Sequence, residues 1–337
     1  MPANVNAPVD AGFFSSSRRF HLLPGEQVHP SELRGYYIDF RPKVAPTDRW
    51  PTPWIRDGYG YVKLAQLALG HFEYFVETGS EEHLAFAEAA CSHFVRTQKR
   101  SGAVDDGGWS HAFAFKHREQ LSPNWLSAMA QGQAASLLLR VFRATGESAF
   151  ADAALLATKP FHHSVRAGGV TGELHGHPFP EEYPTTPQSH VLNGAIFALW
   201  GLRDVAETLQ DKSTVDLHRA MLDGLVQTCD QWDTGRWSRY DLFPRPPINV
   251  SSSFYHHLHC SQLRAMHSLY GLDPFLELAK RYEGYQGHVA LRWLAIAQKV
   301  AFRLRIPRHK IVHPRPEDAP PPENQLKISD SPPIDGL

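Results

Sequence analysis

The chain has 337 residues, of which 42% are hydrophobic and 20% are charged, and its formal net charge is -1. This length and apolar content allow a large core, and the near-neutral balance gives no basic excess of the kind that binds nucleic acid or an anionic membrane surface. The three cysteines, Cys91, Cys229 and Cys260, are widely spaced, which excludes a disulfide framework and a metal site built from paired cysteines, and fits a reducing compartment.

The two ends of the chain differ in composition from its middle. Residues 1–53 are predicted to form an N-terminal extension, in which the aromatic stretch GYYIDFRPKV at 35–44 suits a β hairpin or an extended arm. Residues 308–337 combine dense proline with charge and predict a disordered tail. No apolar run matches a signal peptide or a membrane span. We therefore expect a cytoplasmic location.

Residues 54–307 carry a helical pattern. From Tyr61 to Phe75, apolar residues recur at steps of three and four, as one buried helix face requires. The pattern stops at a glycine, and a second helical stretch follows a candidate N-cap at Ser80. Similar breaks recur along the chain, so helix, turn and helix form a repeat. The breaks lie at Gly79, Gly146, Asp211 and Gly271.

The spacing of these breaks indicates the fold. Gly79 and Gly146 are 67 residues apart, which is longer than the repeats of an α-solenoid. The additional residues fall in loops rich in glycine and aromatic residues, at 102–115, 166–184 and 232–247. We therefore predict a mainly α fold, an α/α toroid of four helical hairpins, with these loops gathered at one end. A right-handed superhelix with a peptide-binding groove is the alternative.

Two loops carry residues suited to proton transfer. The segment EEYPTTPQSHVLNG at 181–194 places Glu181, Glu182 and Tyr183 before a prolyl turn, which can fix a carboxyl group beside a phenol. The segment WDTGRWSRYDL supplies Tyr240 beside Arg239, and Tyr255 follows 15 residues later. A phenol acts as a base near neutral pH only where a cation or a hydrogen-bond donor stabilises the phenolate. Surface acidic residues and packed tyrosines are the alternative reading.

Histidine spacing raises the question of a metal site. Two His-x-His pairs would face one way on a strand. These pairs are His175–His177 and His257–His259. The second pair lies in a helical stretch, where residues two apart diverge, and no third ligand occurs at a fixed spacing. We predict no metal, and expect His256 and His259, three apart on one helix face, to contact a substrate carboxylate or to form a structural pair.

Amide side chains mark the start of another apolar helix. The segment NWLSAMAQGQAASLLLR at 124–140 contains Asn124, Gln131 and Gln133. These amides are candidates for binding sugar hydroxyls, and the alternative is that they bond neighbouring loops.

Four phrases, SPNWLSAMAQGQ, EEYPTTPQSHVLNG, GRWSRYDL and YHHLHCSQL, together resemble the C-terminal catalytic domain of the D-glucuronyl C5-epimerase family. Their order and mutual spacing also match, over about residues 59–285. The resemblance implies an incomplete α/α toroid that converts glucuronic to iduronic acid units within heparan-type polymers, without a cofactor or a metal. It also implies an acidic polysaccharide as partner rather than nucleic acid, and a homodimer.

The resemblance assigns roles to residues of this chain. The catalytic positions of the family fall on Glu182, Tyr183, Tyr240 and Tyr255. The predicted substrate-binding residues are Arg239, Arg245, His256, His259, Asn124, Gln131, Gln133 and Asn193. One departure stands out: animal members read YDLRH where this chain reads YDLFPRPP, so Phe243 replaces an arginine suited to binding the uronate carboxylate. Arg245 is the candidate substitute.

The reaction explains why these residue types are needed. Removing the hydrogen at C5, α to a carboxylate, builds negative charge that nearby donors must neutralise. Inversion then requires proton donation from the opposite face of the ring. We assign Tyr255 to one face and Glu182 with Tyr183 to the other, with Tyr240 assisting. A polysaccharide lyase, which begins with the same proton abstraction, and a non-catalytic glycan-binding protein are the alternatives.

Overall fold

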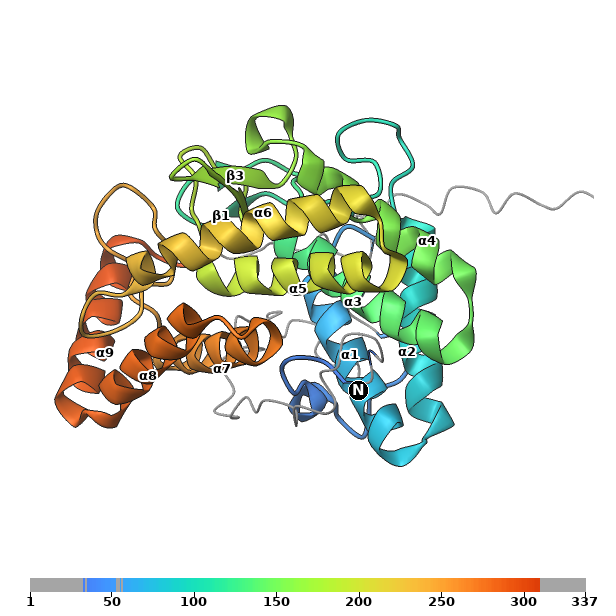
Figure 1. Ribbon diagram of the computed structural model, residues 1–337, viewed down its shortest axis with the longest axis horizontal. Helices are drawn as coiled ribbons and strands as arrows, with labels where there is room; N and C mark the ends of the chain where they lie inside the picture. Colours follow the sequence, from blue (N-terminus) through green and yellow to red (C-terminus); the bar gives the residue numbers. More distant parts are fainter. Residues whose placement is uncertain (1–32, 34, 53–54, 56, 310–337) are drawn as a thin grey trace, which may run out of the picture.

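A computed structural model describes residues 33, 35–52, 55 and 57–309. The predicted tail beyond residue 309 and the first 32 residues of the predicted extension lie outside the described residues. The described part of the chain is mainly helical (Figure 1). Its α-helices are α1 (Tyr61–Thr78), α2 (Glu81–Thr97), α3 (Ala128–Thr145), α4 (Ser148–Leu156), α5 (Leu192–Leu209), α6 (Lys212–Thr228), α7 (Ser253–Tyr270), α8 (Asp273–Gly287) and α9 (Val289–Arg305).

Short elements occupy the connections between the helices. The strands form two antiparallel pairs, β1 (Phe115–Lys116) with β2 (Gln120–Leu121), and β3 (Thr171–Leu174) with β4 (His177–Pro180). Single turns of 3₁₀ helix are η3 (Arg41–Lys43), η4 (Lys159–His162), η5 (Val165–Ala167) and η6 (Cys229–Trp232). Within the described ranges, no helix has the length and apolar character that crossing a bilayer requires.

The predicted breaks in the helical pattern are confirmed as the turns of helical hairpins. Gly79, Gly146 and Gly271 end α1, α3 and α7 in the left-handed conformation, with φ of 70°, 77° and 66°. Glycine takes this conformation without a steric penalty, and so it commonly ends a helix. In the third hairpin Gln210 ends α5 in the same conformation, and the side chain of Asp211 caps α6 by accepting a hydrogen bond from Thr214 N.

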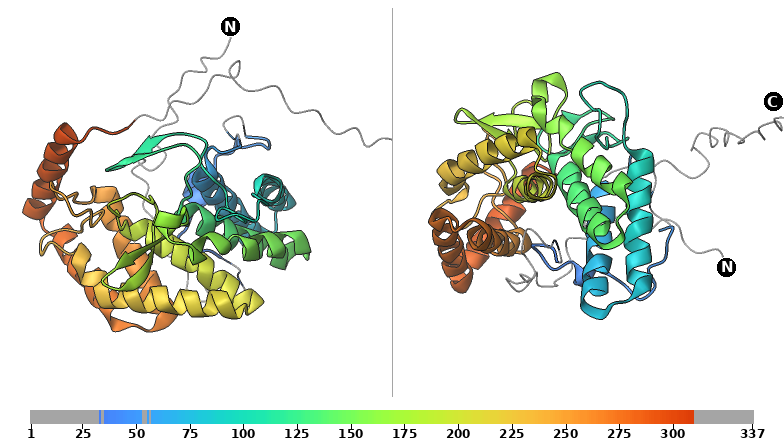
Figure 2. Two further views of the ribbon diagram at one scale, coloured as in Figure 1. Left: turned by 90° about the horizontal axis from the view of Figure 1, so that it is seen from above. Right: turned by 45° about the vertical axis from the view of Figure 1, so that its right-hand side comes forward.

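The first helices of the hairpins pack in chain order: α1 against α3, α3 against α5, and α5 against α7. At the contact between α3 and α5, two glycines face each other and allow the two backbones to approach closely. A Cβ atom added at Gly201 would lie 2.2 Å from the carbonyl oxygen of Gly132. Figures 1 and 2 show α1–α2 and α7–α9 at opposite ends of this row, with α3 and α5 between them.

The sequence predicted a β hairpin or an extended arm at residues 35–44, and the structure has no β strand there. This segment runs without strand structure up to η3, and its aromatic side chains, including Tyr36 and Phe40, are fully buried against the helices. The physical reason is a buried carboxylate on α1. Glu73 accepts hydrogen bonds from the backbone N–H groups of Tyr36 and Phe40, at 3.3 and 2.8 Å. A side chain thus supplies the acceptors that a partner strand would have supplied.

The three long connections, from α2 to α3, α4 to α5 and α6 to α7, contact one another. The ring of Phe115 in the first connection stacks on Tyr183 in the second, with centroids 5.2 Å apart. Arg118 in the first connection donates to the carbonyl oxygen of Pro247 in the third, at 3.1 Å. The loops that the sequence marked as rich in glycine and aromatic residues therefore meet in one place.

Candidate active site

The four predicted catalytic residues come together where the three connections meet. The ring of His117, in the β1–β2 hairpin, stacks on Tyr183 with centroids 4.5 Å apart, and lies 5.7 Å from the ring of Tyr240. Tyr240 meets Tyr255 at the start of α7, edge to face, at 4.8 Å. The charge of Glu182 acts on all three phenols. One carboxyl group and three phenols therefore share one site.

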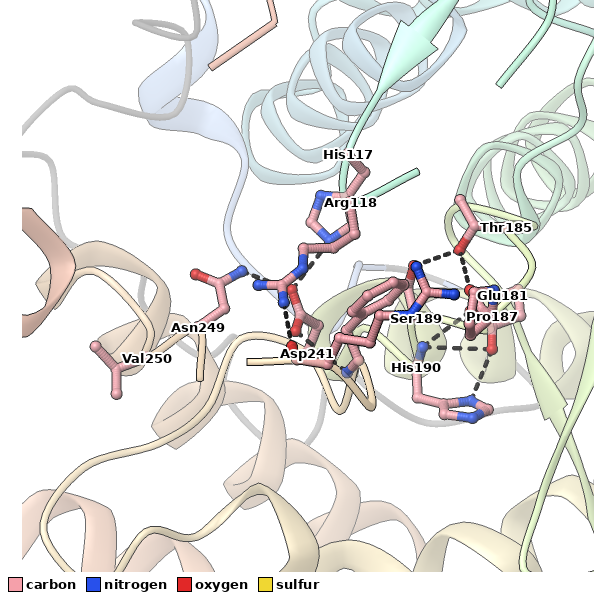
Figure 3. A network of polar contacts seen from close by, with 12 residues as sticks. His117, Arg118, Glu181, Thr185, Pro187, Ser189, His190, Asp241, Asn249 and Val250 are labelled. Atoms are coloured by element: carbon pink, nitrogen blue, oxygen red, sulfur yellow. Dashed lines mark hydrogen bonds and ion pairs between the residues drawn. The ribbon is translucent and has the colours of Figure 1, made fainter. Parts of the chain in front are cut away.

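Glu181 fixes the loop that carries Glu182. It is fully buried, and it accepts a hydrogen bond from His190 N at 3.0 Å. Its Oε1 also lies 2.7 Å from Nδ1 of the same histidine. Figure 3 shows these contacts beside a hydroxyl pair, Thr185 and Ser189, whose oxygens are 2.7 Å apart. The first glutamate of the pair is therefore bound within the loop, which leaves the second to face the tyrosines.

Glu182 occupies a space that a glycine leaves open. A Cβ atom added at Gly194 would lie 2.4 Å from Glu182 Oε2. Burial raises the pKa of Glu182 to about 7; a hydrogen-bonding interaction with Tyr183 opposes this rise, and the charge of Glu181 adds to it. Oε2 is buried and has no hydrogen-bond partner among the described residues. A carboxyl group with these properties can act as a general base near neutral pH.

The tyrosines are held as neutral phenols. Burial raises the pKa of Tyr183, Tyr240 and Tyr255, and the charge of Glu182 raises each further. The cations Arg308 and Arg303 act in the opposite direction on Tyr255, but burial dominates. The sequence suggested that basic neighbours would favour phenolate. The structure instead gives phenols that rest protonated and can donate a proton or a hydrogen bond.

A buried aspartate connects the β1–β2 hairpin to the α6–α7 connection. Asp241 accepts a hydrogen bond from Asn249 Nδ2 at 2.6 Å, and its Oδ2 lies 3.1 Å from His117 Nε2 (Figure 3). Burial raises the pKa of Asp241, but the hydrogen bond and charge of His117, with Asn249 and Arg118, hold it below its usual range. Asp241 thus orients His117, the ring that stacks on Tyr183.

Basic side chains surround these groups, and the sequence reasoning missed most of them. The guanidinium carbon of Arg118 lies 4.6 Å from the centroid of the Phe243 ring, and Lys299 Nζ lies 5.5 Å from that of Tyr240. Burial lowers the pKa of Arg118, Arg303 and Lys299, the last to about 7. His117, Arg118 and the two α9 residues belong to no motif. The sequence feature that could have identified two of them is the spacing of Lys299 and Arg303, which lie four residues apart and so share one helix face.

Two predicted substrate-binding residues lie at the edge of the site and one lies within it. Arg239 is half-buried near Asp241, and its Nε has no hydrogen-bond partner among the described residues. Arg245 is exposed and pairs with Glu119 at 2.8 Å. Asn124 is exposed in a left-handed conformation, with φ of 71°. Of these three, Arg239 is the one that interacts electrostatically with Asp241 and Arg118.

The predicted amides lie inside the helical core. Gln131 binds the backbone of Trp109 through both amide atoms. Gln133 Oε1 accepts from Gln66 Nε2 at 3.2 Å. Asn193 is buried, and its Oδ1 has no hydrogen-bond partner among the described residues. The structure does not bring the two glutamines together with the tyrosines.

The predicted histidine pair supports the loop that carries Tyr240. His256 stacks on Trp237 at 3.7 Å, and its Nδ1 lies 2.8 Å from Ser238 Oγ. His259 Nδ1 lies 3.1 Å from the same oxygen. Burial lowers the pKa of His256 to about 4 and that of His259 to about 3, so both are neutral. No group of three or more metal-ligating side chains occurs in the described part of the chain.

Comparisons with known proteins show which proteins this chain resembles. Residues 104–284 match the model of the D-glucuronyl C5-epimerase C-terminus. The chain is 33% identical over 224 residues to a D-glucuronyl C5-epimerase of Caenorhabditis elegans, covering 61% of this chain and 35% of that protein. It is 26% identical over 197 residues to an uncharacterized protein of Methanocaldococcus jannaschii, covering 56% and 62%. The chain thus spans less than two thirds of each relative, and α9 lies beyond the residues that match the family.

Proposed function

This chain belongs to the D-glucuronyl C5-epimerase C-terminus family, and from that premise we propose that it is a polysaccharide uronate C5-epimerase. The substrate is a glucuronic acid unit of an acidic, heparan-type polymer, and the product is iduronic acid. The observation that carries the proposal is the convergence of Glu182 with three protonated tyrosines. Glu182 and Tyr183 lie in the α4–α5 connection, Tyr240 lies in the α6–α7 connection, and Tyr255 lies at the start of α7. The hairpins that carry these connections form an incomplete α/α toroid in this proposal.

The geometry supports a two-sided transfer of protons. On one face of the sugar ring, Glu182 with Tyr183 removes the proton at C5, and the electron pair of the C–H bond moves toward the carboxylate. On the other face, the hydroxyl of Tyr255 donates a proton to C5, which completes the inversion. Tyr240 has hydrogen-bonding interactions with both Tyr183 and Tyr255. It can therefore return the proton from one face to the other.

The test is deuterium exchange at C5. The protein is incubated with an N-sulfated heparosan-type polymer in deuterated water, and C5 is followed by NMR. We expect incorporation in the wild type and a loss of at least about 10²-fold in Tyr255→Phe, the usual contribution of an acid–base group. Tyr285→Phe is the matched control, because that hydroxyl contacts Asp233, away from the site; it should retain exchange.

Each other outcome has a defined meaning. Absence of incorporation with every uronate polymer would overturn the proposed epimerase activity. An ultraviolet-absorbing unsaturated uronate would show that the 4-O substituent is expelled, and the protein would then be a lyase. Equal exchange in Tyr255→Phe and the wild type would remove Tyr255 from the mechanism.

A further inference from the structure

Residue 243 is a phenylalanine in this protein, whereas animal members of the family carry an arginine at this position. Phe243 is buried, and its ring lies under the guanidinium of Arg118. Phe302 of α9 lies near the same guanidinium, 5.2 Å from its carbon. An arginine stacked on aromatic rings in this way is held in a fixed orientation. The phenylalanine therefore supports a cation from the β1–β2 hairpin instead of providing one.

Helix α9 brings further positive charge to the same place. Lys299 Nζ donates to Asn249 Oδ1 and to the carbonyl oxygen of Val250, at 2.7 and 2.8 Å. These bonds hold the ammonium beside the ring of Tyr240. Arg303, one helical turn further on, interacts electrostatically with Tyr240 and Tyr255. α9 contains no acidic residue, so nothing on the helix itself neutralises these charges.

The cations at the site form few hydrogen bonds with anionic groups. Arg118 donates to the carbonyl oxygens of Arg245 and Pro247, and Lys299 donates to neutral oxygens. The charge of Asp241 acts on all three cations, but its carboxylate is hydrogen-bonded to Asn249 and His117. Nε of Arg303 is buried without a partner among the described residues. Half-buried cations whose donors meet few anions are stabilised by an anionic ligand.

We propose that Arg118, Lys299 and Arg303 form the subsite that binds the carboxylate of the uronic acid, which we name the cationic subsite. The proposal rests on the proposed function, and it adds a specificity determinant that lies partly outside the residues matching the family. A carboxylate bound there lies beside Tyr240, which places the adjoining C5 near the phenols. The same cations neutralise the charge that grows on the carboxylate as C5 loses its proton.

Binding experiments separate a carboxylate from a sulfate as the ligand. Calorimetry would compare unsulfated heparosan oligosaccharides with N-sulfated oligosaccharides whose carboxyl groups have been reduced to alcohols. The variants are Lys299→Gln, Arg303→Gln and their combination. Arg292→Gln is the matched control, because it removes an equal charge from an exposed position on the same helix.

We expect the wild type to prefer the carboxylated oligosaccharide, and each subsite variant to lose about tenfold or more of that affinity. The carboxyl-reduced oligosaccharide should bind the variants and the wild type equally, and Arg292→Gln should match the wild type. In the exchange assay the subsite variants should show both a higher KM and a lower kcat, because the charge is present in the ground state and grows in the transition state.

The remaining outcomes separate the two proposals. An unchanged carboxylate preference in the folded double variant would overturn the cationic subsite, even if exchange at C5 is observed. If the double variant loses the carboxylate preference but the wild type shows no exchange at C5, the cationic subsite would be supported and the proposed epimerase activity would be overturned. Weaker binding by the variants to the carboxyl-reduced sulfated oligosaccharide would identify sulfate as the ligand and overturn the assignment to carboxylate. Circular dichroism of each variant establishes that it is folded.

Discussion

Two buried ionic clusters in this protein contain similar groups but differ in how their polar atoms are used. In the first, between α3 and α5, Arg140 pairs with Asp204 at 2.6 Å, and both side chains are almost fully buried. Arg140 also donates to the carbonyl oxygens of Gly35 and Ser136, and Asp204 accepts from the hydroxyls of Ser136 and Tyr37. This cluster is closed, because its groups satisfy one another.

The second cluster, at the tyrosines, is open. Among the described residues, Oε2 of Glu182 and the Nε atoms of Arg239 and Arg303 are buried without a hydrogen-bond partner. Each such atom costs roughly 1–3 kcal/mol of folding free energy. Proteins retain costs of this kind mainly where a ligand or a reaction uses the group. We therefore infer that the closed cluster stabilises the fold and that the open cluster binds a substrate. Three substitutions test this difference.

The largest effect is expected for Glu182→Gln. It removes the proposed base, so deuterium exchange at C5 should fall by about 10²–10⁴-fold. The free energy of unfolding of the variant, by contrast, should increase. Because the folded pKa of about 7 exceeds the unfolded value, ionised Glu182 destabilises the fold increasingly as pH rises from about 4.5 to 7, and fully above 7. At pH 8 the variant should be more stable by about 2–3 kcal/mol.

Urea denaturation at pH 8 and pH 4.5 measures this stability difference, which should nearly vanish at the lower pH. A variant that loses stability at pH 8 would place Glu182 with the closed cluster, as a structural group. Glu283→Gln is a suitable control, because its carboxylate is partly exposed and pairs with Arg264; stability and exchange should both change little.

The second change breaks the closed cluster. Arg140→Met leaves Asp204 buried without its cation, which should lower the free energy of unfolding by about 3–5 kcal/mol. Urea denaturation measures this loss, and exchange per folded molecule should stay near the wild-type value. Arg264→Met removes a partly exposed pair with Glu283 and should cost only about 1 kcal/mol or less. A loss for Arg140→Met no greater than that of the control would contradict the assignment of the closed cluster to folding.

The sequence predicted features that depend on nearby residues. The hairpin turns at Gly79, Gly146 and Gly271 follow from a glycine that ends one helix just before the next begins. Glu182 and Tyr183 were predicted from one short phrase, EEYP, that resembles the family and places the two side chains in one loop. In each case the interacting groups are a few residues apart, and the local pattern contains the information.

Features that depend on distant partners could not be predicted. The aromatic stretch at 35–44 suited a strand, but its backbone donors find Glu73 on α1. His117 acquires its place from Asp241, which lies 124 residues away. Lys299 reaches the site only because α9 packs beside the α6–α7 connection. Tertiary contacts decided these positions, and no motif encodes them.

The third change alters the pH dependence of binding at the open cluster. Burial lowers the pKa of Lys299 to about 7, the charges of Arg303, Arg308 and Arg118 contribute, and Asp241 opposes them. Lys299 therefore loses its charge as pH rises through about 7. Carboxylate binding needs that charge, so binding should be strongest below pH 7, and should weaken by up to about tenfold per pH unit above it.

Lys299→Arg tests this dependence, because a guanidinium stays charged throughout the range. Calorimetry between pH 6 and 9, in two buffers with different ionisation enthalpies, measures affinity and proton uptake together. The Glu182→Gln background removes the other group of the open cluster whose pKa lies near 7. A tenfold preference for charged Lys299 raises its pKa by about one unit on binding. In that background, Lys299 should therefore take up about half a proton or more on binding at pH 8, and the arginine variant almost none. Equal proton uptake in the two proteins would mean that the bound carboxylate does not reach Lys299, so the polar atoms of the open cluster would need a different ligand.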